Sequence, residues 1–400
     1  MSNVKQAKFG REGTLIALGS SLTIMGSVMV APILPKMAQE FAPTTPDIGN
    51  LLPLIVVAPA LAIVLFAPLA GWLSDKFGRK LMLVIATIFY AILGVLPAFQ
   101  NDLQEIVLTR FIFGCAEAAI MTCCTALIAD YWQGNDRLKI VNFQVIAVGV
   151  IGALFYVMGG VLGEESWRTP FYLYLLPLLL VPLFIKMLWD PTHFVEPQLL
   201  DQSAKVAKGS VISCYLMVFF GMVLAFVVTI QVPSILANHL GVTSTTKIAL
   251  ATGGSMLTSL VGSLIWPLVR RLLGVTGCNA ALMTLIAFGL YLLVIANSYE
   301  DVLVALVFHG VGIGLLLPNL MASVMSALPD AVRGRGIGGF TACLYLGQFS
   351  SPFIVGFLST GSSLQEAILT LVYAAVAVAI VWVIYRVFVS VDTPQYQVAT

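Results

Sequence analysis

Three ionisable side chains of this 400-residue sequence stand inside long apolar runs: Arg110, Glu117 and His309. A charge at the middle of a membrane costs at least about 3 kcal/mol on insertion scales, so each is a functional candidate if its run crosses a membrane. The chemistry open to them is the binding of a charged group, or the uptake and release of a proton.

Arg110 and Glu117 are seven residues apart, which places them on one face of a helix and about 10 Å apart along it. That is too far for a direct bond, so we expect them to share the wall of one cavity. Burial favours the protonated form of a carboxylate, so we expect protonation of Glu117 to compete with substrate binding and thereby to couple the two. Arg110 would adjust that equilibrium or bind an anionic group of the substrate. The alternative is a fixed pair of hydrogen-bonding residues that never titrates.

His309 lies beside a glycine-rich stretch (310–314), and a lone histidine there is either a hydrogen-bonded packing residue or a proton carrier. Uncharged polar and aromatic side chains in the apolar runs are further candidates for a substrate cavity. They are Gln144, Gln231, Tyr291, Asn319, Tyr345 and Gln348.

The elements that carry these residues are predicted by composition. The chain is 59% apolar and 10% charged, with a mean hydropathy of +0.99. Soluble domains carry about 25% charged residues, so we expect the lipid bilayer to be the solvent. The net charge of +1 argues against a nucleic-acid binder.

Motifs of other function classes are missing. The sequence has no GxxxxGK[ST], HExxH or GxSxG segment, and its six cysteines lie in apolar runs without CxxC spacing. The match of residues 334–339 to GxGxxG stands between two apolar helices rather than in a βαβ unit. We therefore expect no enzyme activity, no cofactor and no metal site.

Windows of about 20 apolar residues recur along the chain, and each is long enough to cross a bilayer as a helix. This predicts an all-α membrane protein with twelve spans. The predicted spans are 13–35, 50–71, 80–100, 104–129, 138–163, 168–189, 210–234, 247–269, 277–297, 301–326, 335–358 and 364–389.

Positive charge gives the orientation. With the N-terminus in the cytoplasm, sixteen of the 20 Lys and Arg residues fall on the cytoplasmic side, and only Lys36, Arg168 and Lys247 fall outside. This asymmetry follows the positive-inside rule and predicts that both termini are cytoplasmic. A polar segment (190–209) divides the chain into an N-terminal six-helix bundle (1–189) and a C-terminal one (210–400). Such 6+6 carriers bind substrate between their halves.

The loop after the second predicted span carries the most specific motif, Gly71-Trp-Leu-Ser-Asp75-Lys-Phe-Gly78-Arg79-Lys80. It resembles the GxLxDrxGrk signature of the major facilitator superfamily and stands where that family carries it. The resemblance implies the major facilitator fold of two pseudo-symmetric six-helix bundles. It also implies a conformational latch formed by Gly71, Asp75, Gly78, Arg79, Lys80 and Asp130. In it, Asp75 would face the N-terminus of the eleventh span, and Arg79 would pair with Asp130.

Weaker motifs resemble those of twelve-span drug:proton antiporters. Ala-Pro-Ile-Leu-Pro closes the first predicted span (31–35), and Arg110 with Gly114 matches an RxxxG element. The fifth span has the family's glycines but lacks the proline of the antiporter motif, which leaves uptake or facilitated diffusion open.

Together these features predict a secondary-active carrier, working as a single chain in a bacterial-type inner membrane. We expect it to export small amphipathic compounds such as drugs, siderophores or metabolites, coupled to protons and by alternating access. The alternatives are an uptake carrier or uniporter for a small organic anion, and a membrane sensor that does not transport.

Overall fold

A computed structural model describes residues 10–190 and 207–389 of the chain. All regular elements in these two ranges are helices. Those of the first range are α1 (Arg11–Val28), η1 (Ala31–Ile33), α2 (Leu34–Phe41), α3 (Ile48–Phe77), α4 (Arg79–Val95), η2 (Leu96–Phe99), α5 (Leu103–Tyr131), α6 (Gly134–Leu162), η3 (Thr169–Leu180) and α7 (Val181–Met187). Those of the second are α8 (Lys208–Asn238), α9 (Thr245–Val294), α10 (Tyr299–Ala327), α11 (Asp330–Leu358) and α12 (Leu364–Val389).

Eleven helical stretches of the described chain are long and apolar enough to cross a membrane. One of them, α9, has 50 residues and contains a non-helical residue, Gly274, with φ 70° and ψ −175°. A helix of that length would measure about 75 Å, more than twice the thickness of a hydrocarbon layer. The chain reverses direction at Gly274, so α9 supplies two spans and the predicted total of twelve is confirmed.

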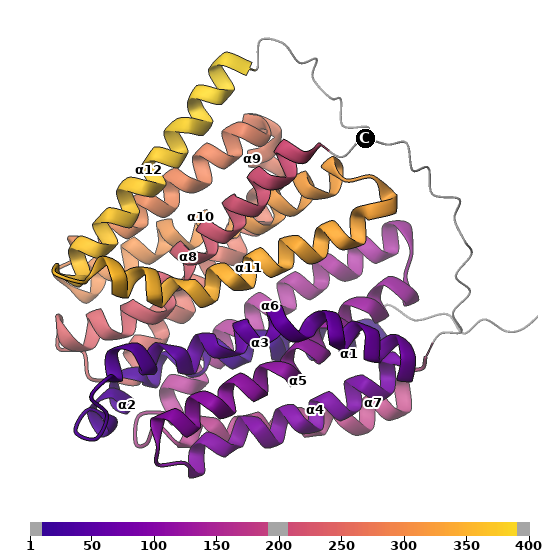
Figure 1. Cartoon of the computed structure of the whole chain (residues 1–400), viewed down its shortest axis with the longest axis horizontal. Helices are drawn as coiled ribbons and strands as arrows, with labels where there is room; N and C mark the ends of the chain where they lie inside the picture. Colours follow the sequence, from indigo (N-terminus) through magenta and orange to yellow (C-terminus); the bar gives the residue numbers. More distant parts are fainter. Residues whose placement is uncertain (1–9, 191–206, 390–400) are drawn as a thin grey trace, which may run out of the picture.

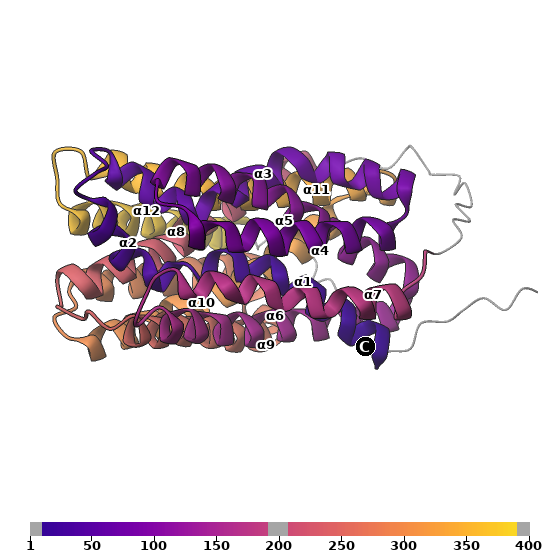
Figure 2. The same cartoon turned by 90° about the horizontal axis from the view of Figure 1, so that it is seen from below.

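The helices before residue 190 lie on one side of the molecule and α8 to α12 lie on the other (Figure 1). Seen at right angles, the helices run roughly parallel along the long axis (Figure 2). We call the end with residues 10, 190, 207 and 389 the terminal side, and the opposite end, with the loops that follow α2, α6, α8 and α11, the distal side. The predicted linker lies mostly outside the described residues, so the exact boundaries between the halves stay a prediction.

A glycine with a positive φ angle stands at the reversal between the second and third spans and again at the reversal between the eighth and ninth spans. Gly78 has φ 97° and Gly274 has φ 70°, which are left-handed conformations that favour glycine. At Gly71, by contrast, an added Cβ would meet only Thr122 Cγ2 at 3.7 Å. Gly78 is therefore needed for the turn, whereas the space beside Gly71 would admit a Cβ at ordinary van der Waals distance.

The sixth span departs from the predicted α-helix. It begins as a 3₁₀ helix, η3, and becomes α-helical only in α7.

The outer surface is apolar. Phe357, Phe388 and Leu179 are at least two-thirds exposed, with exposed fractions of 80%, 75% and 69%. Such side chains would form an unfavourable surface in water but match the hydrocarbon of a bilayer.

Candidate proton and substrate site

Glu117 lies near the middle of α5, where the first half faces the second. The residue is only 3% exposed. Its carboxylate packs directly against Gly26 of α1, because a Cβ added at Gly26 would stand 2.9 Å from Oε1 and 3.2 Å from Oε2. The same atom would meet the Phe113 ring at 3.1 Å. A glycine in the first span is thus what leaves room for this carboxylate.

No hydrogen bond to the Glu117 carboxylate is present within residues 10–190 and 207–389. Other buried polar side chains are engaged: Ser20, Ser21 and Thr87 each donate to a backbone carbonyl one turn earlier. A buried ionised carboxylate without a donor is strongly unfavourable. This environment is the geometric reason to consider Glu117 as a proton carrier.

Residues of the second half reach this level of α5. The Tyr345 hydroxyl of α11 lies 3.2 Å from the Met121 sulfur of α5, one turn beyond Glu117. Glu117, Met121 and Tyr345 therefore form a group at the contact between the halves.

Arg110 lies in a different environment, enclosed entirely by the first half. Its Nε donates to Ile55 O of α3 at 3.0 Å and its Nη2 donates to Gly26 O of α1. Nη1 donates to the Tyr174 hydroxyl of η3 at 3.2 Å, and the guanidinium carbon stands 4.4 Å from the centre of the Phe113 ring.

Arg110 is 0% exposed, so in this conformation it presents no surface to an anionic substrate. In this conformation its hydrogen bonds join α1, α3 and η3 to α5, and its place in a substrate cavity stays a prediction. Arg110 and Glu117 do share one neighbour, Gly26, as their spacing on one helix face suggested.

His309 is buried inside the second half. Its Nε2 stands 3.3 Å from Leu224 O of α8, and its Nδ1 has no partner in the described chain. Its backbone packs against Gly289, where an added Cβ would meet the His309 backbone N at 2.5 Å. His309 is thus enclosed by packed helices of the second half, and its role as a proton carrier stays a prediction.

Asn319 also belongs to the interior of the second half. Its Nδ2 donates to Asn279 Oδ1 at 2.7 Å, and its own Oδ1 accepts from Trp266 and Arg270. Tyr291 is 43% exposed, in the part of α9 after the reversal at Gly274. Neither joins the group around Glu117.

The three predicted glutamines differ in position. Gln231 lines a hollow of about 160 Å³ on the distal side, between Asn50 and Pro53 of α3 and Pro352 of α11. Gln348 is buried on α11, one turn from Tyr345, and Gln144 is half-buried on α6. Of the three glutamines, Gln348 is thus the one that shares a helix with a member of the Glu117 group, Tyr345.

The predicted latch residues come together on the terminal side. Arg79 pairs with Asp130 at the end of α5, and its Nη1 also donates to Ala126 O at 3.1 Å. Asp75 is 66% exposed, and the partner in its ion pair is Arg79, at 3.3 Å. Asp190 accepts from the Lys80 backbone N–H at 2.8 Å, so it caps the start of α4. These contacts join residues of the first half to one another and to Asp190, the first residue of the predicted linker.

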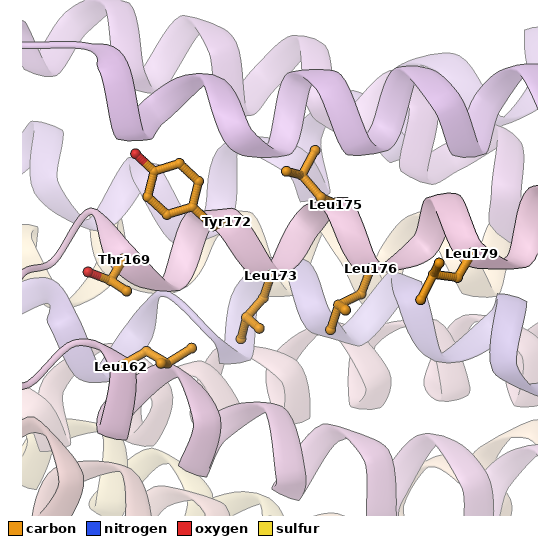
Figure 3. A pocket seen from close by; sticks show the side chains of 7 residues that line it. All are labelled: Leu162, Thr169, Tyr172, Leu173, Leu175, Leu176 and Leu179. Carbon is orange, nitrogen blue, oxygen red and sulfur yellow. The ribbon is translucent and has the colours of Figure 1, made fainter.

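A larger hollow, of about 400 Å³, opens on the outer face of η3 (Figure 3). It is lined by Leu162 of α6 and by Thr169, Tyr172, Leu173, Leu175, Leu176 and Leu179. Its leucines are partly exposed on the outside of the bundle, so this hollow faces lipid and not the space between the halves.

Two site residues were missed by sequence reasoning. Gly26 gave no signal, because it is one small residue in an apolar run. Tyr174 could have been suspected, because an arginine deep in a span requires a polar partner and Tyr174 is a polar aromatic residue of a neighbouring span.

The sequence is similar to a known protein family and to individual proteins of known name. The family model described as Major Facilitator Superfamily matches residues 16–207 and 211–398. Multidrug resistance protein 1 of Bacillus subtilis is 23% identical over 350 residues, which cover 86% of this chain and 89% of that protein. Quinolone resistance protein NorA of Staphylococcus aureus is 30% identical over 192 residues, covering 45% of this chain and 48% of that protein.

Solved structures share the fold. The inward open conformation of the xylose transporter XylE from E. coli superposes with a TM-score of 0.77, at 16% identity and 97% coverage of both chains. A bacterial homologue of the human lysosomal transporter Spinster gives a TM-score of 0.72 at 15% identity, covering 94% of this chain and 95% of that one. At such identities the likeness concerns the fold alone.

Proposed function

Because this chain belongs to the Major Facilitator Superfamily of membrane transporters, we propose that it is a proton-coupled exporter of small amphipathic compounds. Members of this family are multi-pass membrane transporters and not enzymes. The observation that carries the proposal is Glu117, a buried carboxylate without a hydrogen-bond donor at the contact between the two halves. The names of the two relatives, which speak of multidrug and quinolone resistance, support export.

The coupling follows from competition at one carboxylate. A proton on Glu117 removes its charge, which suits the dry packing against Gly26 and Phe113. A positively charged substrate group beside Glu117 would stabilise the ionised form instead. Because proton and substrate oppose each other at Glu117, the gradient of one can drive the movement of the other.

The charges around the group favour cationic or neutral substrates. Of the three ionisable side chains predicted to be deep in the spans, Arg110 is fully enclosed and His309 faces the inside of the second half. Glu117 is then the charge that a substrate between the halves would meet. An organic anion would be repelled by Glu117 in its ionised form, and Arg110 is fully enclosed in this conformation.

We place the terminal side in the cytoplasm, because most Lys and Arg residues lie on that side of the predicted spans. The halves then close against each other on the outer, distal side. Export proceeds as they rock to open that side, which is the alternating access expected for a 6+6 carrier.

The test uses inside-out vesicles with an imposed proton gradient and a pH-sensitive dye. Cationic, neutral and anionic compounds are added in turn to wild type, Glu117→Gln and the control Glu105→Gln. Glu105 is an exposed carboxylate at the start of the same helix. We expect cationic compounds to collapse the gradient in wild type and Glu105→Gln, and not in Glu117→Gln.

Other results would replace the proposal. A response to anionic compounds alone would favour the carrier for a small organic anion. Transport that persists unchanged in Glu117→Gln, with the same pH dependence, would make Glu117 a fixed structural residue. A rate of substrate transport that does not depend on the proton gradient would favour a uniporter.

A further inference from the structure

Glu164 stands in the distal loop after α6 and reaches across to the second half. Its Oε2 accepts from the Thr246 backbone N–H at 3.0 Å and from the Thr246 hydroxyl at 2.9 Å. The hydroxyls of Thr245 and Ser244 lie at 2.9 Å and 3.3 Å from the same oxygen. One carboxylate thus gathers three consecutive hydroxyl residues of the opposite half.

These residues are the first turn of α9, which begins at Thr245. The first N–H groups of a helix have no partner inside the helix, and the positive end of its dipole attracts negative charge. Ser244 caps the Lys247 N–H from within the same helix, and Glu164 supplies a second acceptor from the other half. The contact is therefore a helix cap made across the interface.

Both partners are held in place. Lys36 at the end of the first span donates to Gly163 O at 2.9 Å and also to Glu164 O, which fixes the loop that carries the carboxylate. On the other side, the Thr245 hydroxyl lies 2.7 Å from Gly160 O as well as near Glu164, and its single hydrogen serves one of them at a time. The α6 backbone is so close here that a Cβ on Gly160 would collide with Ala249.

The contact lies at the closed end of the interface. Between α6 and α9, contacts run from Gly149 with Leu260, through Gly152 with Met256, to Gly160 with Thr245, which is from mid-height to the distal side. The charged group on the terminal side, by contrast, is made within the first half by Arg79 and Asp130. Opening the distal side requires that the cap on α9 be broken.

We propose that Glu164 and the first turn of α9 form a latch that holds the distal side closed and is released each time the carrier opens that side. Its charge is stable at physiological pH. Although burial alone would raise the pKa of Glu164, the hydrogen bonds from Thr246, Thr245 and Ser244 lower it to about 2. The latch is thus set by geometry and not by the proton gradient, and it does not depend on the substrate or on the coupling ion.

The test measures the distance across the distal side without substrate or gradient. Spin labels on cysteines at Pro46 and Ser362, which are exposed in the loops before α3 and after α11, report opening by pulsed electron resonance in nanodiscs. The two half-buried native cysteines, Cys115 and Cys343, are replaced by serine. The matched control is Glu165→Ala, an exposed carboxylate one residue further on.

Because hydrogen bonds to a charged group are the stronger kind, we expect Glu164→Ala to raise the ratio of open to closed about tenfold. Glu164→Gln keeps an acceptor and should raise it less, about threefold. Glu165→Ala should leave the distances as in wild type. An unchanged distribution in Glu164→Ala, or an equal change in Glu165→Ala, would overturn the latch.

A second pair of variants keeps the proposal testable if Glu164→Ala does not fold. Thr246→Val removes one hydroxyl donor and leaves the backbone N–H, so we expect a small rise of about threefold in the open fraction. In the double variant with Glu164→Gln, the rise in the ratio of open to closed should be smaller than the product of the rises in the two single variants, because both residues belong to one contact. Fully independent effects would show that the two residues do not form one latch.

Discussion

The replacement of Arg110 by lysine separates a structural role from a substrate-binding role. Lysine keeps the positive charge but loses the planar fork that donates in several directions at once. Arg110 serves three acceptors on three elements: Ile55 O, Gly26 O and the Tyr174 hydroxyl. One ammonium group cannot reach all three positions.

The magnitude follows from the acceptors left without a donor. Each buried acceptor that loses its partner costs about 1–3 kcal/mol. With one or two acceptors abandoned, we expect Arg110→Lys to lower the free energy of unfolding by about 2–4 kcal/mol. The loss should be independent of any substrate, because it arises inside the first half.

The assay is thermal unfolding of the purified carrier in detergent, beside transport in vesicles for compounds of each charge. Arg137→Lys is the control, because Arg137 is exposed at the start of α6. We expect a melting temperature several degrees lower for Arg110→Lys, unchanged for Arg137→Lys, and a loss of transport that is equal for all substrates. Unchanged stability with a selective loss of anionic substrates would refute the structural role.

Three further predictions concern other contacts. Gly26→Ala should push the Glu117 carboxylate aside, since the added Cβ would stand 2.9 Å from Oε1; we expect overpacking of about 1–3 kcal/mol, measured as a lower melting temperature, and a shifted pH dependence of transport. Asp130→Asn removes the less exposed of the two carboxylates that pair with Arg79 and leaves Asp75 as its one remaining ion-pair partner, so we expect stability to fall by about 1 kcal/mol, measured by thermal unfolding. The pKa of Glu164 is held at about 2, below its ordinary value of 4.5, so its contribution is complete above pH 4.5 and is lost as the pH falls toward 2. The distal distances should therefore stay constant from about pH 8 to pH 5 and widen only below about pH 4.

Much of the fold could be predicted because membrane spans are a strong signal. Hydrophobic runs of about 20 residues must be helical in lipid, so their number and rough bounds followed from composition. Gly78 could be read as a turn residue from its place in a motif. The change of helix type in η3 could not be predicted, because proline is tolerated in α-helical spans as well as in 3₁₀ segments.

The site was harder to predict, because residue spacing shows which side chains share a helix face but not which residues of other helices they contact. The spacing of Arg110 and Glu117 placed both on one face, and both do meet Gly26. The spacing could not predict that Arg110 would donate its hydrogen bonds to carbonyl groups of α1 and α3, or that Glu117 would have no donor. Asn319 shows the same limit: its partners Asn279, Trp266 and Arg270 come from distant parts of α9.

Glu164 escaped sequence reasoning for a different reason. It lies in a short polar loop where an acidic residue is ordinary, and its importance comes from a partner 80 residues later. Only the close packing of α6 on α9, made possible by Gly160, brings the carboxylate to a helix start of the other half.

The enclosure of Arg110 also has a consequence for how the chain is made. When α5 leaves the translocation machinery, its arginine enters the bilayer at a cost of about 3 kcal/mol unless it finds acceptors. Ile55 and Gly26 have already been synthesised by then, but Tyr174 is added 64 residues after Arg110. Membrane integration of α5 is thus expected to be cooperative with α1 and α3 and to be completed only when η3 arrives. A ribosome-bound chain that ends before Tyr174 should hold α5 less firmly in the membrane than one that extends past α7.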